Sequence, residues 1–296
     1  MKLDGRRESS NVEDRRGMSG GTKAGMGIGG IIIVALMAWL TGGNPLEAVM
    51  QQVAENGGLG SLTGTNTEVN EGQREFTEEE QALAKFSTQI LAGTEDVWSE
   101  IFKQNGAQYQ NPTMVLYTDG TQTACGQGSA AMGPFYCSGD QKLYIDLSFF
   151  TQMKRQLGVE GNTFAYAYVI AHEIGHHVEN SLGILGKAHQ AMNQTDQVQA
   201  NQISVRLELL ADYYAGGWAH YEDAINHSME YGDLEKGLEL AKAIGDDWLQ
   251  KKAQGRATPE SFTHGTSDQR KRWLKKGYET GNMSTSTFNV QNYNDL

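Results

Sequence analysis

The stretch that most constrains the fold is NTFAYAYVIAHEIGHHVEN, residues 162–180, because it combines an apolar helical pattern with clustered metal-binding side chains. Asn162 is suited to cap a helix, and apolar residues follow at helical spacing. On that helix His172 and His176 are four residues apart, about 40° apart around the axis, so both imidazoles reach one ion. The run therefore predicts a helix that presents two histidines to one point.

Glu173 is about 100° from His172 around the same helix, which places it beside a bound ion rather than on it. There it reaches a water molecule in an open coordination position. Two neutral nitrogen ligands and a neighbouring carboxylate that takes a proton from water are what zinc-dependent hydrolysis requires. His177 points about 140° from His172, so we expect it to pack elsewhere. Such a motif arises by chance in roughly one chain in a hundred, and it needs a third ligand.

The third ligand is not in the continuation of the motif, because Glu179 and Leu182 stand where a longer zinc motif has glycine and histidine. A second helical stretch, VRLELLADYYAGGWAHYE, begins at residue 205. Its Glu208 and Asp212 share one face, and we predict that Glu208 is the third zinc ligand and that Asp212 accepts the ring N–H of His172. The alternative is an exposed acidic face that pairs with solvent or a neighbouring arginine.

Small residues in both helices suit a close approach between them: Gly175, Ala211, Gly216 and Gly217. The other histidines of this region, His189, His220 and His227, are expected to be surface or packing residues.

A further histidine, His264, precedes a predicted helix start in ESFTHGTSDQRKRWLKKG. Hydrolysis of a peptide bond needs a donor for the oxyanion that develops, and His264 or Arg270 is suited to that role or to contact with substrate. A surface loop and a basic helix face are the alternative.

Residues 24–40 contain no charge, and 17 residues lie at the short end of the roughly 17–25 that span a bilayer. Basic residues precede the stretch and none follows until Arg74, which favours a cytoplasmic N-terminus. A buried helix and a cleavable signal peptide are the alternatives. The expected organisation is a cytoplasmic tail (1–23), a transmembrane anchor (24–40), a flexible linker (41–74), a folded domain (75–282) and an irregular tail (283–296), with the domain periplasmic or extracytoplasmic at the inner membrane.

Cys125 and Cys137 are the only cysteines, and in an oxidising compartment they are expected to form a disulfide; two unrelated buried thiols are the alternative. The net charge of −12 argues against a nucleic-acid partner.

Helices are predicted from Thr77, with a capping box to Glu80, and again from Thr94. Strand composition marks NPTMVLYTDG and QKLYIDLSFF, and the second is a candidate edge for pairing with substrate. The fold class is α+β, mainly helical, in one domain.

Several segments together resemble the bacterial neutral zinc metallopeptidase family: HEIGHH, ELLADYYAG, PFYCSGD, GRRESSNVEDRRG and FTHGTSDQR. The resemblance covers nearly the whole chain, and it implies a zincin-like fold in which the edge strand of a small mixed sheet lies over the active-site helix. FTHGTSDQRKRWL is also similar to a segment of membrane-associated gluzincin proteases, in which a proline follows the histidine. Here Gly265 takes that place, and Arg270 is retained.

The sequence thus predicts a membrane-anchored zinc peptidase, an endopeptidase, that holds one Zn²⁺ and acts on peptide or protein substrates of the cell envelope. A zinc-binding interaction or chaperone module without turnover is the alternative, and a metal-free helical domain is a third possibility.

Overall fold

The computed structural model describes residues 1–17, 75–157 and 163–296. The expected anchor 24–40, the linker 41–74 and the capping residue Asn162 lie outside them. None of the helices within the three described ranges combines the length and apolar character that a bilayer crossing requires.

The described chain is mainly helical with one small mixed sheet, as predicted, and it also contains a separate hairpin. The strands are β1 (Val12–Asp14), β2 (Thr113–Tyr117), β3 (Gly120–Thr123), β4 (Gly126–Ser129), β5 (Phe135–Cys137) and β6 (Lys142–Asp146). The helices are α3 (Glu78–Gln104), α4 (Ser148–Leu157), α5 (Thr163–Ser181), α6 (Ile184–Met192), α7 (Gln197–Asn226), α8 (Asp233–Ala243), α9 (Asp246–Gln254) and α10 (Ser267–Thr280). Four single 3-10 turns complete the described elements: Ala130–Met132, Pro259–Ser261, Thr287–Asn289 and Tyr293–Asp295.

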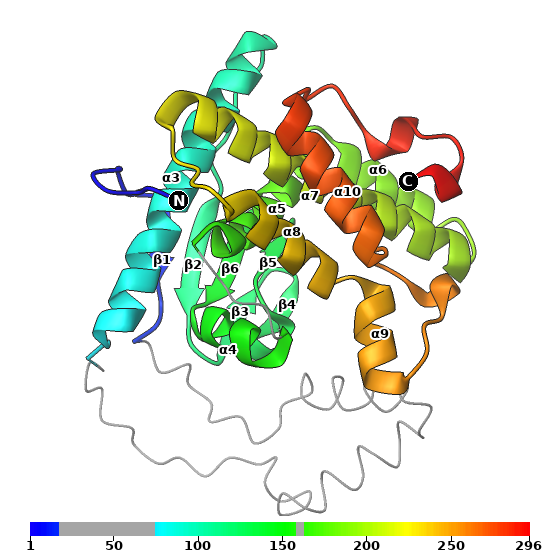
Figure 1. Cartoon of the computed structure of the whole chain (residues 1–296), viewed down its shortest axis with the longest axis horizontal. Helices are drawn as coiled ribbons and strands as arrows, with labels where there is room; N and C mark the ends of the chain where they lie inside the picture. Colours follow the sequence, from blue (N-terminus) through cyan, green and yellow to red (C-terminus); the bar gives the residue numbers. More distant parts are fainter. Residues whose placement is uncertain (18–74, 158–162) are drawn as a thin grey trace, which may run out of the picture.

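The four-stranded sheet has the order β1-β2-β6-β5. β1, β2 and β6 are parallel, and β5 pairs antiparallel with β6. Figure 1 shows β1, β2 and β6 beside α3 on one side of the molecule, with α7 and α10 packed together on the other. Helix α5 packs against both α3 and α7, so it joins the sheet side to the α7–α10 side.

The predicted edge strand is wrong: β6 is an interior strand with β2 on one side and β5 on the other. Leu143 and Ile145 face the main core, whereas Tyr144 lies in a second buried cluster on the opposite face with Val115. Both faces of β6 are therefore covered. The residues that alternate along this strand point into two different apolar clusters, and not alternately into the core and into solvent. The edge next to β6 is β5, and the last part of QKLYIDLSFF belongs to α4.

Helix α3 begins as predicted, because Thr77 and Glu80 form the reciprocal capping box. The predicted second start at Thr94 is wrong, since α3 continues through it to Gln104. The hydroxyl of Thr94 donates to the carbonyl of Leu91 within the helix, 2.7 Å away, and Thr94 is completely buried. The hydroxyl is satisfied by back-bonding, so it does not cap a new helix.

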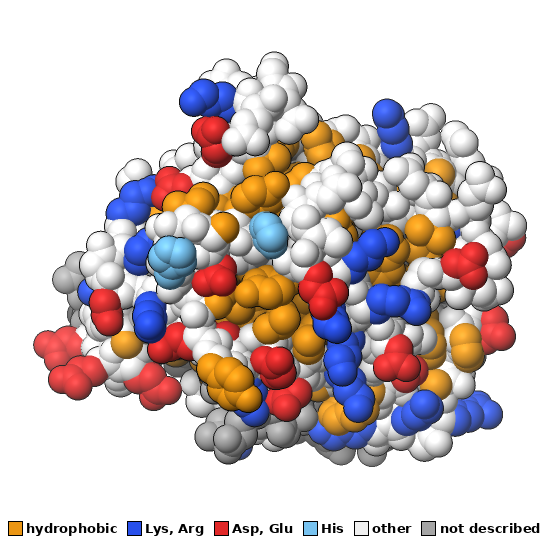
Figure 2. Space-filling view, turned by 45° about the horizontal axis from the view of Figure 1, so that its top comes forward, with side chains coloured by type: hydrophobic (Ala, Val, Ile, Leu, Met, Phe, Trp, Pro, Cys, Tyr) orange, Lys and Arg blue, Asp and Glu red, His pale blue; other side chains and the backbone are white. Residues whose placement is uncertain are grey.

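Residues at both ends of the described chain pack on the domain. The segment 283–296 contains two 3-10 turns, and the carbonyls of Thr287 and Val290 accept hydrogen bonds from Arg206 of α7. Figure 2 shows that charged side chains of both signs are mixed over one face of the molecule, with hydrophobic groups between them.

Candidate metal centre

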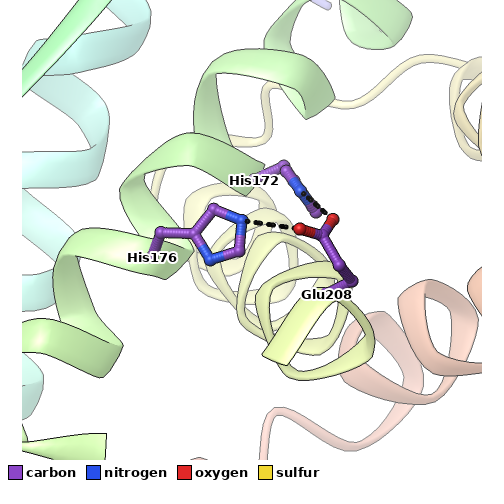
Figure 3. A group of neighbouring side chains, drawn as sticks. All are labelled: His172, His176 and Glu208. Carbon is purple, nitrogen blue, oxygen red and sulfur yellow. Dashed lines mark ion pairs between the residues drawn. The ribbon is translucent and has the colours of Figure 1, made fainter. Parts of the chain in front are cut away.

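Helix α5 holds His172 and His176 one turn apart on a buried face, with the apolar residues around them packed in the core. Their Nε2 atoms point toward Glu208 of α7 (Figure 3). The Nε2 of His172 lies 3.2 Å from one oxygen of Glu208, and the Nε2 of His176 lies 3.6 Å from the other. Within the described residues these three form the group that is able to hold a metal ion, with one ligand atom from each lying within 4.8 Å of the others.

These separations fit zinc. Ligand atoms roughly 2.0–2.2 Å from a tetrahedral ion are about 3.3–3.6 Å from each other. Two imidazole nitrogens and one carboxylate are a common ligand set of catalytic zinc sites and leave a fourth position open. The Glu208 side chain is 17 % exposed, so the centre is close to solvent rather than sealed in the core. The residues present therefore suit one zinc ion with an accessible position.

The close approach of α5 and α7 depends on Gly175. A Cβ atom at this position would lie 2.8 Å from the Cα of Ala211 and 2.9 Å from its carbonyl oxygen, which is closer than atoms pack. The predicted use of small residues between the ligand-bearing helices is thus observed at Gly175 and Ala211. Gly216 and Gly217 serve other contacts, since they face Leu274 of α10 and Met283.

Asp212 is completely buried and forms the centre of a hydrogen-bond network behind His172. The expected contact is present, because one oxygen of Asp212 accepts from the Nδ1 of His172 at 2.9 Å and from the hydroxyl of Tyr168 at 2.5 Å. Arg270 donates to both oxygens of Asp212, at 2.9 Å each. Despite the burial of Asp212, the Arg270 guanidinium and His172 lower its pKa to about 2.

Arg270 is only 3 % exposed, and α10 presents it to Asp212 rather than to solvent. Its guanidinium is occupied by the Asp212 carboxylate, with Tyr168 and His172 at 3.4 Å. This placement favours a positioning role for Arg270 over the expected contact with substrate.

Glu179 is a residue that sequence reasoning missed. Its Oε2 lies 2.9 Å from the Nδ1 of His176, and the residue is completely buried. Each histidine therefore has its Nδ1 on a carboxylate and its Nε2 directed at the centre, which fixes the same ring orientation in both. Burial raises the pKa of Glu179 to about 7, with His176 acting against the shift. The only signal in the sequence was the i,i+3 spacing from His176.

The carboxylates around the two histidines raise the pKa of both imidazoles. Burial disfavours their charged forms, but Asp212 and Glu208 raise the pKa of His172 to about 10. Against the same penalty, Glu179 and Glu208 raise the pKa of His176 to about 9. Burial acts to raise the pKa of Glu208 as well, but His264 and the two histidines hold it well below its usual range. Because ligand nitrogens must be deprotonated, metal binding at this centre releases protons.

Glu173 lies beside the centre and does not belong to the ligand group, as predicted. It is 9 % exposed, and burial raises the pKa of its carboxyl, whereas His172 and His176 act in the opposite direction. It accepts a backbone hydrogen bond from Tyr136 in β5. The edge strand of the sheet therefore borders Glu173 directly.

The strand β5 is fixed in place from two directions. The predicted disulfide is present between Cys125 and Cys137, with the Cα atoms 5.8 Å apart, and it joins the β3–β4 hairpin to the end of β5. From α5, His177 lies 3.0 Å from the hydroxyl of Tyr136, and its other ring nitrogen lies 2.7 Å from the carbonyl of Gln110. Both nitrogens of His177 are thus engaged away from the centre, as expected for a residue that is not a ligand.

His264 lies in the loop before α10, where its Nδ1 is 3.3 Å from Asp246. The Asp246 carboxylate also accepts the backbone N–H groups of Thr263, His264 and Gly265, at 2.7–3.1 Å. The Glu208 carboxylate is the main cause of the raised pKa of His264, which brings this histidine into the electrostatic field of the centre. Gly265 has φ +93°, which proline is unable to adopt, so the loop differs here from its proline-containing counterpart.

The rival histidines take no part in the described metal group. His220 lies 2.8 Å from the carbonyl of Tyr278 in the α7–α10 contact, and His189 and His227 are exposed.

Comparison with known proteins places the chain in a family. The family model described as "Putative neutral zinc metallopeptidase" matches residues 1–288. The chain is 45 % identical over 290 residues to the uncharacterized protein YpfJ of Escherichia coli (strain K12), which covers 95 % of this chain and 96 % of YpfJ. It is also 41 % identical over 182 residues to the uncharacterized protein Rv2575 of Mycobacterium tuberculosis (strain H37Rv), or 58 % of this chain and 60 % of that protein. No solved structure matches the chain.

Proposed function

The chain belongs to the neutral zinc metallopeptidase family, and from this premise we propose that it hydrolyses peptide bonds at a zinc centre formed by His172, His176 and Glu208. The observation that carries the proposal is the pairing of two inward-facing Nε2 atoms with the Glu208 carboxylate, beside a buried Glu173 that is not a ligand. When bound, zinc polarises a carbonyl group and makes a water molecule more acidic.

Glu173 is the general base of the proposed reaction. A base is most effective when its pKa lies near the working pH, and burial raises the pKa of this carboxyl toward that range. Glu173 accepts the proton of the attacking water and returns it to the leaving amine. The backbone hydrogen bond from Tyr136 holds the carboxylate in position for both transfers.

The other residues of the centre orient the zinc ligands or stabilise the charge that develops in the reaction. Asp212 and Glu179 hold the two histidine rings so that each directs Nε2 at the centre. Arg270 keeps Asp212 ionised. His264, whose pKa is raised mainly by the Glu208 carboxylate, is the residue that we assign to stabilise the oxyanion that forms on the scissile carbonyl.

We propose an extended peptide as the substrate. β5 is the edge strand of the sheet, and the backbone of its residue Tyr136 donates a hydrogen bond to Glu173. A peptide that pairs with this strand therefore passes directly by the metal centre. A strand edge recognises backbone rather than a chain terminus, which supports cleavage within a chain.

The test is a screen of the purified, zinc-loaded protein against a diverse peptide library, with cleavage read by mass spectrometry and bound zinc by elemental analysis. The proposal expects internal cleavage and one zinc per chain, and it expects Glu208→Ala to lose both. Zinc without any cleavage would indicate a binding module that has no turnover. Absence of zinc from the wild-type protein would refute the metal centre itself.

A further inference from the structure

The N-terminal segment, residues 1–17, is packed on the same folded unit that carries the metal centre. Figure 1 shows it running beside α3, far in sequence from the helices that it reaches. Its contacts extend from β2 and α3 to α7. The segment therefore bridges separate parts of the domain rather than resting on one of them.

The first group of contacts completes the sheet. β1 pairs parallel with β2, with Val12 opposite Met114 and Asp14 opposite Leu116. The backbone N–H of Met114 donates to the carbonyl of Asn11 at 2.9 Å, and the backbone N–H of Arg15 donates to the carbonyl of Leu116 at 2.8 Å. Without β1 these backbone groups of a buried strand would lose their partners, which is costly.

The second group joins basic residues of the segment to buried acids of the domain. Arg6 lies 2.5 Å from Glu222 of α7, whose side chain is only 2 % exposed. Glu95 of α3 is 4 % exposed at its side chain, and it accepts from Ser9 at 2.5 Å and from Asn11 at 2.7 Å. Arg7 adds an ion pair to Glu95 at 3.0 Å. The domain thus carries buried carboxylates whose basic partners come from the segment.

Arg16 fixes the C-terminal end of the segment to the domain. It is 8 % exposed, donates to the carbonyl of Glu80 at 3.1 Å, and lies over the ring of Phe76 with 4.2 Å to the centroid. An arginine that bonds to a backbone carbonyl and stacks on an aromatic ring is held as part of the fold, not merely attracted to a charged surface.

We infer that residues 1–17 are an integral part of the peptidase domain, and that the N-terminus therefore lies in the same compartment as the metal centre. The family model includes this segment, since its match begins at residue 1. The arrangement expected from the sequence, with 1–23 in the cytoplasm and the domain outside, requires the two parts to be on opposite sides of a bilayer. A segment on the far side is unable to pair with β2 or with Glu95 and Glu222. The docked segment and the single-pass topology exclude each other in one molecule.

The first experiment compares compartments directly. Ser10→Cys places a thiol on an exposed position of the segment, and Lys103→Cys places one on an exposed position of α3. Intact bacterial cells expressing full-length chain with either substitution are treated with a membrane-impermeant maleimide, before and after lysis. Wild-type chain, whose two cysteines form the disulfide, provides the background. We expect the two thiols to be labelled alike, either both in intact cells or both only after lysis. Labelling of one in intact cells and of the other only after lysis overturns the inference.

The second experiment tests docking in the purified full-length protein by thermal unfolding. Arg6→Glu puts an acid against the buried Glu222, and Lys2→Glu makes the same charge change at an exposed position of the same segment. We expect Arg6→Glu to lower Tm by roughly 5 °C or more relative to Lys2→Glu. Equal Tm values for the two variants would show that the segment is not docked.

Discussion

Gly175→Ala is expected to disrupt the metal centre by separating the two helices that carry its ligands. The new Cβ would lie 2.8 Å from the Cα of Ala211, whereas carbon atoms pack at about 3.5–4.0 Å. Because the nearest atoms belong to the backbone of α7, the helices have to move apart by about 0.7 Å at this point. Zinc ligand distances tolerate shifts of about 0.2 Å. His172 and His176 lie within one turn of Gly175, and Glu208 lies within one turn of Ala211, so the displacement acts on all three ligands.

The expected loss of zinc affinity is about 100-fold, comparable to removal of a residue that orients a ligand. That loss removes about 2.7 kcal/mol of zinc-linked stabilisation at saturating zinc. The metal-free protein changes less, because overpacking costs about 1–3 kcal/mol and the better helix propensity of alanine offsets about 1 kcal/mol of it. The assay is a competition titration against a chelator of known affinity, with thermal unfolding of metal-free and zinc-loaded protein in parallel.

Gly186→Ala is the matched control. This glycine lies in α6, and a Cβ there would meet no atom within 4 Å. It is expected to stabilise the protein by up to about 1 kcal/mol and to leave zinc affinity unchanged. If Gly175→Ala binds zinc within twofold of wild type, the argument that helix contact sets the ligand geometry is refuted.

Three further predictions concern the surroundings of the centre. Glu179→Gln is expected to lower zinc affinity about tenfold in a chelator competition, because the Nδ1 of His176 loses its charged acceptor. Glu100→Gln, at an exposed position of α3, is the control, and equal zinc affinities of the two variants would contradict the role of Glu179. The free energy of unfolding of the metal-free protein, measured with urea, should fall as pH rises from about 6.5 toward 9–10, because both zinc-site histidines keep protons in the folded state that unfolded histidine releases near 6.5. The zinc-loaded protein should not show this decline. A free energy of unfolding of the metal-free protein that rises over that pH range would refute the assigned pairing of the histidines with carboxylates. Replacement of both cysteines by alanine should lower the free energy of unfolding by about 3 kcal/mol in urea denaturation, as expected for a loop closed over 12 residues, and an unchanged value would show that the bond does not constrain the chain.

The ligand set was predictable because its geometry is local. The spacing of His172 and His176 fixes their directions on any helix, and a largely enclosed acid on a later helix, α7, is the natural partner of two histidines. The disulfide and the capped start of α3 at Thr77 follow from equally short-range patterns.

The features that sequence reasoning missed depend on burial or long-range pairing. Glu179 looks like an ordinary acid on a helix, and only packing shows that it is enclosed against His176. Strand composition does not reveal that β6 lies between two neighbours, because the partners come from residues 113–117 and 135–137. The basic residues of 1–17 suggest an orientation signal, although Arg6 and Arg16 pair with groups more than sixty residues away.

The most direct test of the account compares peptide cleavage by wild type and Glu173→Gln at equal zinc occupancy. The substitution keeps the size of the side chain and removes its basicity, while His172, His176 and Glu208 remain to hold the metal. We predict one zinc per chain in both proteins and a rate at least roughly 100-fold lower in the variant. Equal cleavage by the two zinc-loaded proteins would contradict the assignment of Glu173 as the general base and, with it, the proposed mechanism.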